Sequence, residues 1–221
     1  MRNMTKRRRY LISSEKKSVL PDEYQEVKWL RGTGTQYCIL PYGLGYNDGH
    51  FYGIKGDIEA LDSTRYSEIW ITASDGIPSS SYYHRWGIVL QYGDLQVGVY
   101  PDFQHIEYDA LSYHFEMNDN SIVKINESEW DSPTYPQSYG SQLYLGAGLD
   151  TSSNVAIHNN NVLIKSIELT EDNQTIYTLI PCFRKADNKA GLFYWIDYSQ
   201  GISGFLTNSA GGSDFLIGPD V

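Results

Sequence analysis

Short runs of alternating apolar and polar residues fill the chain from residue 21 onward and predict an all-β fold. The runs are rich in β-branched and aromatic residues, and Gly, Asn, Asp or Pro separates them, as in short strands joined by turns. No window keeps apolar residues at helical i, i+3, i+4, i+7 spacing across three turns. We expect strands at 36–40, 51–61, 68–73, 86–92, 95–100, 113–117, 122–126, 142–146, 162–169, 175–180, 191–197 and 215–218.

This number of short strands is typical of one large domain with two packed sheets. We therefore expect a sandwich or jelly roll of two antiparallel sheets over residues 21–221, preceded by a separate N-terminal segment, residues 1–20. Stretches rich in Gly, Pro, Ser, Asn and Asp are expected to be exposed loops, at 75–81, 130–136, 150–154 and 159–161.

Charge is distributed unevenly between these two parts. Residues 1–17 hold seven basic residues against Glu15, a net charge of +6, so the other 204 residues carry −16 and the whole chain −10. An acidic body repels nucleic acid and anionic membranes, and we expect neither as a partner. The basic segment predicts an attachment arm, with guanidinium groups for carboxylates and an apolar or β-strand anchor behind them. Its residues are Arg2, Lys6, Arg7, Arg8, Arg9, Tyr10, Leu11 and Ile12.

Two cysteines, Cys38 and Cys182, are too few and too far apart for a disulfide framework or a metal site, and we expect two buried free thiols. The apolar run after the arginines, Tyr10-Leu11-Ile12, is too short for a secretion signal. No stretch approaches the roughly 20 apolar residues that span a membrane. The sequence thus predicts a product that stays in the cytoplasm until something else releases it.

Two groups of motifs, one at each end of the body, carry a family resemblance. The opening reads LPDEYQEVKWL at residues 20–30 with GTQY at 34–37, and the ending reads IPCFRKADNKAGLF at 180–193, TNS at 207–209 and IGPDV at 217–221. Together they resemble the concanavalin A-like (laminin G-like) sandwich domains of phages and prophages of gut bacteria. The resemblance spans residues 20–221 and is diffuse in the middle. It departs from the family pattern at 38–41 and at 194–201, where a longer segment suggests a specialised loop or contact.

The resemblance implies an all-β, concanavalin A-like jelly-roll sandwich of two antiparallel sheets with an extended N-terminal arm. It also implies a bacteriophage virion structural protein: a head decoration, head fibre or tail-associated module. Such a module is anchored by its arm to other virion proteins, neighbours copies of itself, is assembled in the host cytoplasm, and binds host or mucus glycans in some cases. The alternative is a bacterial or prophage-encoded lectin module outside the virion.

Catalytic chemistry finds little support in the sequence, and we expect no enzyme. Asp57 and Glu59 share one face of a strand, as glycosidase acids do, but Leu61 interrupts the ladder and Asp62 falls on the other face. They are interpreted as solvated outer-face acids. None of the five histidines lies in a known catalytic or metal motif, and we expect no catalytic residue, metal site or cofactor.

An aromatic cluster behind a Ser-rich stretch is the best candidate for sugar binding, because sugar rings stack on aromatic faces. Its residues are Tyr82, Tyr83, His84, Arg85 and Trp86. The alternative is that Trp86 and one tyrosine enter the core while the others face solvent or a neighbouring subunit. Trp130, Tyr135 and Tyr139 form a second candidate, which equally suits a subunit interface.

Overall fold

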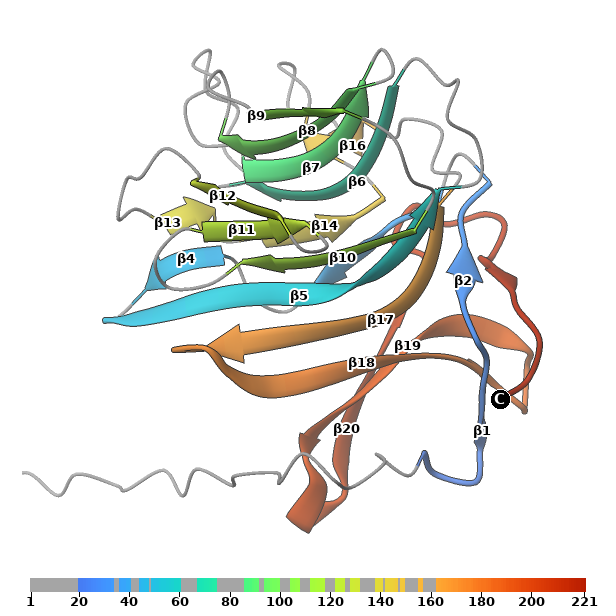
Figure 1. Cartoon of the computed structure of the whole chain (residues 1–221). Helices are drawn as coiled ribbons and strands as arrows, with labels where there is room; N and C mark the ends of the chain where they lie inside the picture. The colour runs from blue at the N-terminus through green and yellow to red at the C-terminus, as the bar shows by residue number, and fades with distance from the viewer. Residues whose placement is uncertain are drawn as a thin grey trace, which may run out of the picture.

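The chain folds almost entirely into β-strands, as the computed structural model in Figure 1 shows. Apart from strands and turns, the described residues form one single-turn 3-10 helix, η1 (Tyr198–Gln200), and none of the described helices is long and apolar enough to cross a membrane. The expected all-β class is therefore confirmed. The structure describes residues 20–33, 36–40, 44–47, 49–60, 67–74, 86–91, 94–99, 104–107, 112–117, 122–125, 128–131, 138–140, 142–146, 148–149, 155–156 and 162–221.

The larger sheet has 13 antiparallel strands, with the long strands β5, β17 and β18 side by side (Figure 1). Its main order is β12 (Ser128–Asp131), β11 (Ile122–Ile125), β10 (Ser112–Met117), β5 (His50–Ala60), β17 (Val162–Glu171), β18 (Gln174–Arg184), β19 (Lys189–Asp197) and β20 (Ile202–Thr207). Five short strands pair beside this path: β1 (Tyr24–Glu26), β2 (Leu30–Arg31), β4 (Leu44–Asn47), β13 (Ser138–Gly140) and β21 (Leu216–Ile217).

The second sheet has six strands, and one core lies between the two sheets. Its order is β3 (Cys38–Leu40), β14 (Gln142–Leu145), β6 (Ser67–Ser74), β7 (Trp86–Gln91), β8 (Asp94–Val99) and β9 (Gln104–Glu107), and β15 (Gly148–Leu149) pairs separately with β16 (Val155–Ala156). Ile71 and Ile88 of this sheet belong to the same buried cluster as Ile54, Phe115 and Ile167 of the larger one. The expected pair of packed sheets is thus present.

Alternation along β5 explains which face of the larger sheet is buried. Ile54 and Ile58 are 0% and 2% exposed, whereas Lys55, Asp57 and Glu59 between and beyond them are partly exposed. Successive strand side chains point to opposite faces, so the isoleucines enter the core and the charged residues form an outer face.

The motifs at the two ends of the body pair with each other in the fold. Strand β1 pairs with β18, with Tyr24 opposite Arg184 and Glu26 opposite Cys182. Next along the chain, β2 pairs with β21, so that Leu30 lies opposite Ile217. The opening and closing segments are therefore paired with each other. We call the paired strands β1, β2, β18 and β21 the terminal joint.

Two buried amides complete this joint. Asn208, 8% exposed, accepts hydrogen bonds from the Tyr37 and Ala210 amides (3.2 and 3.0 Å) and donates to the Gly211 and Ser213 carbonyls (3.0 and 2.8 Å). Gln36, fully buried, donates to Ser213 and Asp214 carbonyls (3.4 and 3.3 Å). Buried polar groups need such partners, which explains an amide in each motif.

Several sequence expectations require correction. Trp130 and Asp131 were expected in a loop but lie in strand β12, and Tyr139 lies in β13. In the segment 194–201, which was expected to be a specialised loop or contact, β19 continues to Asp197, as the expected strand 191–197 predicts, and η1 then follows. The strand pattern was locally weak in β12 and β13, and pairing with neighbouring strands outweighed it. The sequence analysis also did not predict strands β1, β2, β4, β9, β15, β16 and β20.

Both cysteines are buried and free, as predicted. Gly211 and Gly212, with φ of 74° and 78°, lie in the segment that follows β20. Gly191 lies inside β19, where a Cβ would clash with the Leu206 carbonyl oxygen of β20. This glycine permits close approach of β20 rather than a bend.

Candidate functional site

The acids weighed as a glycosidase pair are tied into the outer face of the larger sheet. Asp57 contacts His114 Nδ1 at 2.9 Å and accepts from Ser166 Oγ at 3.1 Å. Glu59 pairs with Lys165 at 2.6 Å. Lys55 pairs with Glu168 at 3.0 Å in the same face. Their interpretation as outer-face acids is confirmed, and each carboxylate has a partner on a neighbouring strand.

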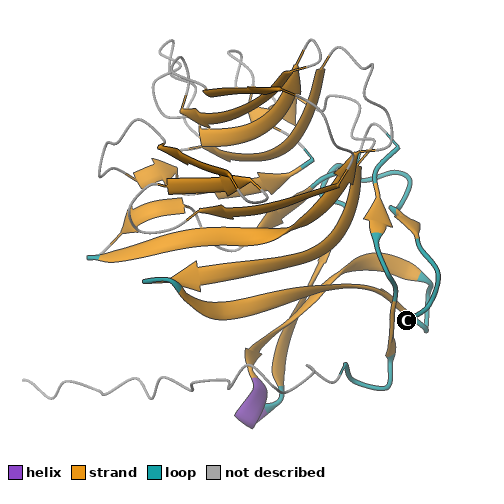
Figure 2. Cartoon of the chain, in the orientation of Figure 1, coloured by secondary structure: helices purple, strands orange, loops and turns teal. Residues whose placement is uncertain are grey.

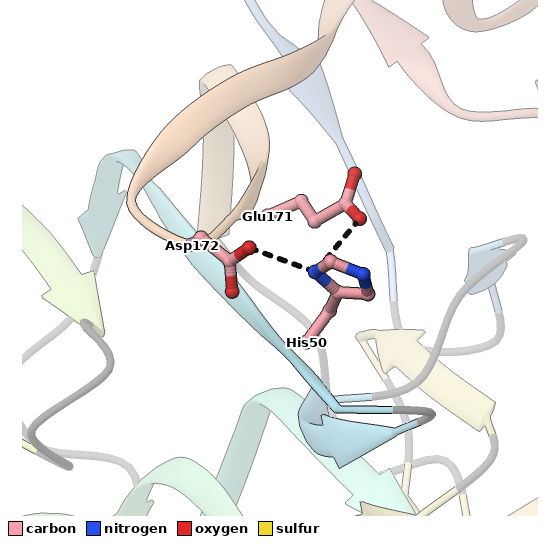
Figure 3. Close-up of side chains that lie close together, drawn as sticks. All are labelled: His50, Glu171 and Asp172. Carbon is pink, nitrogen blue, oxygen red and sulfur yellow. Dashed lines mark hydrogen bonds and ion pairs between the residues drawn. The ribbon is translucent and has the colours of Figure 1, made fainter. Parts of the chain in front are cut away.

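A histidine and two carboxylates meet at the tips of two hairpins (Figure 3). The β4–β5 hairpin turns at Gly49, φ 83°, which places His50 at the start of β5. The β17–β18 hairpin turns through Asp172 and Asn173, both with positive φ, which is the geometry of a two-residue type I′ turn. Because β5 pairs with β17 up to Tyr52 and Glu171, the two tips lie together.

The geometry of this hairpin-tip cluster is that of a hydrogen-bonded clamp. His50 Nδ1 lies 2.8 Å from Asp172 Oδ2 and 3.5 Å from Glu171 Oε1. The other Asp172 oxygen, Oδ1, accepts the Phe51 amide at 3.0 Å, and the Asp172 amide donates to the Phe51 carbonyl at 2.8 Å. One carboxylate therefore holds two hairpins in register.

The same donor atoms form a set that a divalent transition metal accepts. One imidazole nitrogen and two carboxylate oxygens lie within 4.8 Å of one another. Ligands of a tetrahedral zinc ion stand about 3.4 Å apart, given bonds of about 2.0–2.1 Å. The 3.5 Å His50–Glu171 distance fits this spacing, whereas the 2.8 Å contact with Asp172 must lengthen on binding. All three side chains are partly exposed, so the cluster can take an ion only at the protein surface.

Sequence reasoning assigned none of the five histidines to a catalytic or metal motif and missed this cluster, which contains His50. Its only sequence signal is a pair of turn dipeptides, Asp48-Gly49 and Asp172-Asn173. These predict two hairpins but not their proximity, which depends on the register of β5 against β17.

The sites predicted from the sequence lie mainly outside the described residues. Among the proposed sugar-binding residues, Tyr82, Tyr83, His84 and Arg85 are outside, and Trp86 opens β7, opposite Ala73 of β6 and Val99 of β8. Residues 1–19 of the arm are also outside, and the description begins at Leu20.

The closing motif contains an exposed ion pair between Arg184 and Asp187. Arg184 donates from Nε and Nη2 to the two Asp187 oxygens at 3.0 and 2.6 Å. The hydrogen bonds from Arg184 hold the pKa of the Asp187 carboxyl at about 2. Lys185 donates to the Asp22 carbonyl at 2.8 Å, which ties this turn to the start of the body. The pair therefore has a structural use.

Neither thiol is placed for nucleophilic chemistry. Burial raises the pKa of Cys38 to about 12 and that of Cys182 to about 12. The thiolate is the reactive form, so both groups remain protonated and inert at neutral pH.

A cavity of about 380 Å³ lies beside the terminal joint, between β1, β17 and β18. Glu26, Lys28, Lys165 and Thr178 contribute to its wall, together with Val221. Lys165 is already paired with Glu59.

No protein-family model matches the chain, and no curated protein matches it.

Proposed function

We propose that this chain is a non-enzymatic structural module of a bacteriophage particle, attached to other virion proteins through residues 1–20. The body is proposed to be a concanavalin A-like jelly roll that faces outward. The observation that carries the proposal is the separation of charge, with +6 on residues 1–17 and −16 on the remainder. The motifs at both ends of the body are similar to those of phage and prophage sandwich domains, and this similarity is the reason for proposing a bacteriophage particle.

The ion pairs of the body support this division of roles. Ten of the seventeen basic residues follow residue 20. Within the described part of the chain, four of these ten form ion pairs with carboxylates of the body itself: Lys55, Lys165, Arg184 and Lys189. Cationic charge for an external acidic partner is therefore concentrated in the arm.

Attachment then follows from ordinary electrostatics. Arginine guanidinium groups make bidentate hydrogen bonds to carboxylates, so Arg7, Arg8 and Arg9 suit an acidic surface on a capsid or tail protein. The acidic bodies repel one another at short range, which keeps neighbouring copies apart. Many copies on one particle would also give avidity to a weak glycan site.

The test is mass spectrometry of purified particles from the phage or cells that encode the chain. We expect the protein in the particle, and its loss when residues 2–17 are deleted. A triple Arg7→Ser, Arg8→Ser, Arg9→Ser variant should show the same loss, whereas the matched triple change to Lys keeps the charge and should retain partial incorporation. A folded deletion variant that is still incorporated at the wild-type level contradicts arm attachment.

Glycan binding is the second candidate, favoured by the aromatic cluster that immediately precedes β7. The test is a glycan array with the wild type, with Tyr83→Ala and with Trp86→Ala. Loss of binding in both variants supports a lectin site there. No binding by the wild type leaves a purely structural role, and binding by a protein that is absent from particles favours the free lectin module.

A further inference from the structure

The hairpin of β19 and β20 presents apolar side chains to solvent. Its far end, which carries η1, projects away from the packed sheets (Figure 2). Ile196, Tyr198 and Ile202 there are 48%, 59% and 46% exposed. The only other large hydrophobic residues so exposed in the described part of the chain are Leu216, Ile217 and Val221, at the C-terminal end. The tip of this hairpin is thus an exposed apolar surface, which is typical of a site that binds another protein segment.

One side of the same hairpin is an open strand edge. β20 ends the strand order, and the described residues give it ladder pairing only with β19. Cys38 of β3 lies against its opposite end, at the Leu206 and Thr207 carbonyls. The edge near Ile202 is therefore free for another strand within the described structure. Proteins usually cover such edges, since they promote unwanted pairing.

The arm leaves the body beside this surface. Leu20, the first described residue, packs with Tyr24 against a buried cluster formed by Ile180, Cys182 and Phe193, with Trp195 and Phe205 at its margin. Trp195 then contacts Tyr198 edge-on, with ring centroids 5.1 Å apart. A continuous series of side chains thus leads from the base of the arm to the hairpin tip.

One polar atom on this route needs a partner. The Trp195 indole nitrogen Nε1 is buried, and no described residue accepts a hydrogen bond from it. A backbone carbonyl would satisfy this donor. Asp197, at the same hairpin end, is a partly exposed carboxylate whose Oδ1 accepts from Ser199 and Gln200, and a guanidinium group can pair with it.

We propose that the arm folds back in cis onto the β19–β20 hairpin, with Tyr10-Leu11-Ile12 covering Ile196, Tyr198 and Ile202. A carbonyl of the arm accepts from Trp195 Nε1, and an arginine of the Arg7–Arg9 run pairs with Asp197. Seven residues lie between Ile12 and Leu20, and the eight Cα–Cα steps reach about 26 Å when extended, which is ample for this return. The tether raises the local concentration of the arm to the millimolar range, so it outcompetes a second copy in dilute solution.

Docking in cis goes beyond the proposed virion role and does not depend on it. It means that the arm covers the hairpin while the protein is free, and that an assembly partner must compete for the same arm. The isolated full chain is enough to test it, so failure here leaves particle incorporation untouched.

The arm carries its own reporter, because trypsin cleaves after Arg7, Arg8, Arg9, Lys16 and Lys17. The experiment measures the rate of arm cleavage by mass spectrometry for the wild type and for the double variant Ile196→Ser with Ile202→Ser. The matched control is Leu216→Ser with Ile217→Ser, which removes equally exposed apolar residues outside the hairpin. Circular dichroism and thermal unfolding verify that each variant folds.

We expect the hairpin variant to lose its arm about ten times faster than the wild type, while the control variant is cleaved at the wild-type rate. The variant Leu11→Ser with Ile12→Ser should match the hairpin variant. Equal cleavage rates for the wild type and the folded hairpin variant overturn the proposal. Protection that rises with protein concentration between about 1 and about 100 µM also overturns it, because the arm then binds a second copy.

Discussion

Asn208 provides the sharpest test of the terminal joint, through the substitution Asn208→Asp. The new side chain has the same shape and keeps an oxygen for the Tyr37 and Ala210 amides. It replaces the amide donor with an oxygen that faces the Gly211 and Ser213 carbonyls, where the present contacts are 3.0 and 2.8 Å. Two hydrogen bonds become two repulsive contacts in a site only 8% exposed.

The expected loss can be worked from these contacts. Two hydrogen bonds contribute about 2 kcal/mol in total, and buried groups left without partners cost about 1–3 kcal/mol more. We therefore expect the free energy of unfolding at pH 7 to fall by about 3–5 kcal/mol. The matched control Asn188→Asp, in an exposed turn with φ 54°, should change it by no more than about 0.5 kcal/mol.

The loss at position 208 should depend on pH in a defined direction. Burial against two carbonyls raises the folded-state pKa of the introduced carboxyl above its unfolded value of about 3.9. Below that value the carboxyl is protonated in both states and its hydroxyl donates one hydrogen bond. As pH rises through the folded pKa the group ionises, and this part of the stability is lost. The variant is therefore closest to the wild type under acid conditions.

Urea unfolding of the wild type and both variants at pH about 4 and about 7 measures this difference. The reasoning is refuted if the loss caused by Asn208→Asp is equal at the two pH values or larger under acid conditions. A loss below about 1 kcal/mol at pH 7 would show that the amide does not hold the joint.

Three further outcomes follow from the structure. Cys38 and Cys182 should not react with a thiol reagent in the native protein at pH 8, because burial raises each pKa to about 12. Both thiols should react in denaturant, and a thiol that reacts in the native state contradicts this. Asp187, with a folded pKa of about 2, should add stability above its unfolded pKa of about 3.9 and lose it as pH falls through about 2; an NMR titration midpoint near 3.9 would refute the Arg184 contact. In urea unfolding, Phe193→Ala should cost about 3–5 kcal/mol, because its fully buried ring packs against Tyr24 and Trp195; a cost below about 1 kcal/mol would contradict that packing.

One experiment with Zn²⁺ distinguishes whether the hairpin-tip cluster binds a metal ion or only holds the two hairpins together. Thermal unfolding is measured with and without Zn²⁺ for the wild type, His50→Ala and His114→Ala. His114 Nδ1 also contacts an aspartate, Asp57, at 2.9 Å on the exposed outer face, so His114→Ala is the matched control. If Zn²⁺ raises Tm and only His50→Ala abolishes the rise, the cluster is a metal site. If Zn²⁺ does not raise the Tm of the wild type, the cluster serves only to hold the two hairpins together.

Local patterns explain why part of the fold was predictable. Alternation along β5 predicted both its buried isoleucines and the outward position of Asp57 and Glu59. The same logic failed at Trp130 and Tyr139, which lie in short strands that depend on the neighbours that pair with them. The histidine of the hairpin-tip cluster was visible in the sequence, but its carboxylate partners lie more than 120 residues away.

The sequence by itself determined the all-β class, most of the strand positions, the burial of both thiols and the charge contrast between arm and body. Each of these follows from composition or from a repeat of two residues along one strand. Only the tertiary structure decided that Tyr37 meets Asn208 across 171 positions, that His50 meets Asp172, and that Leu20 lies beside the exposed β19–β20 hairpin. These contacts depend on strand order and register between distant segments, which local alternation does not encode.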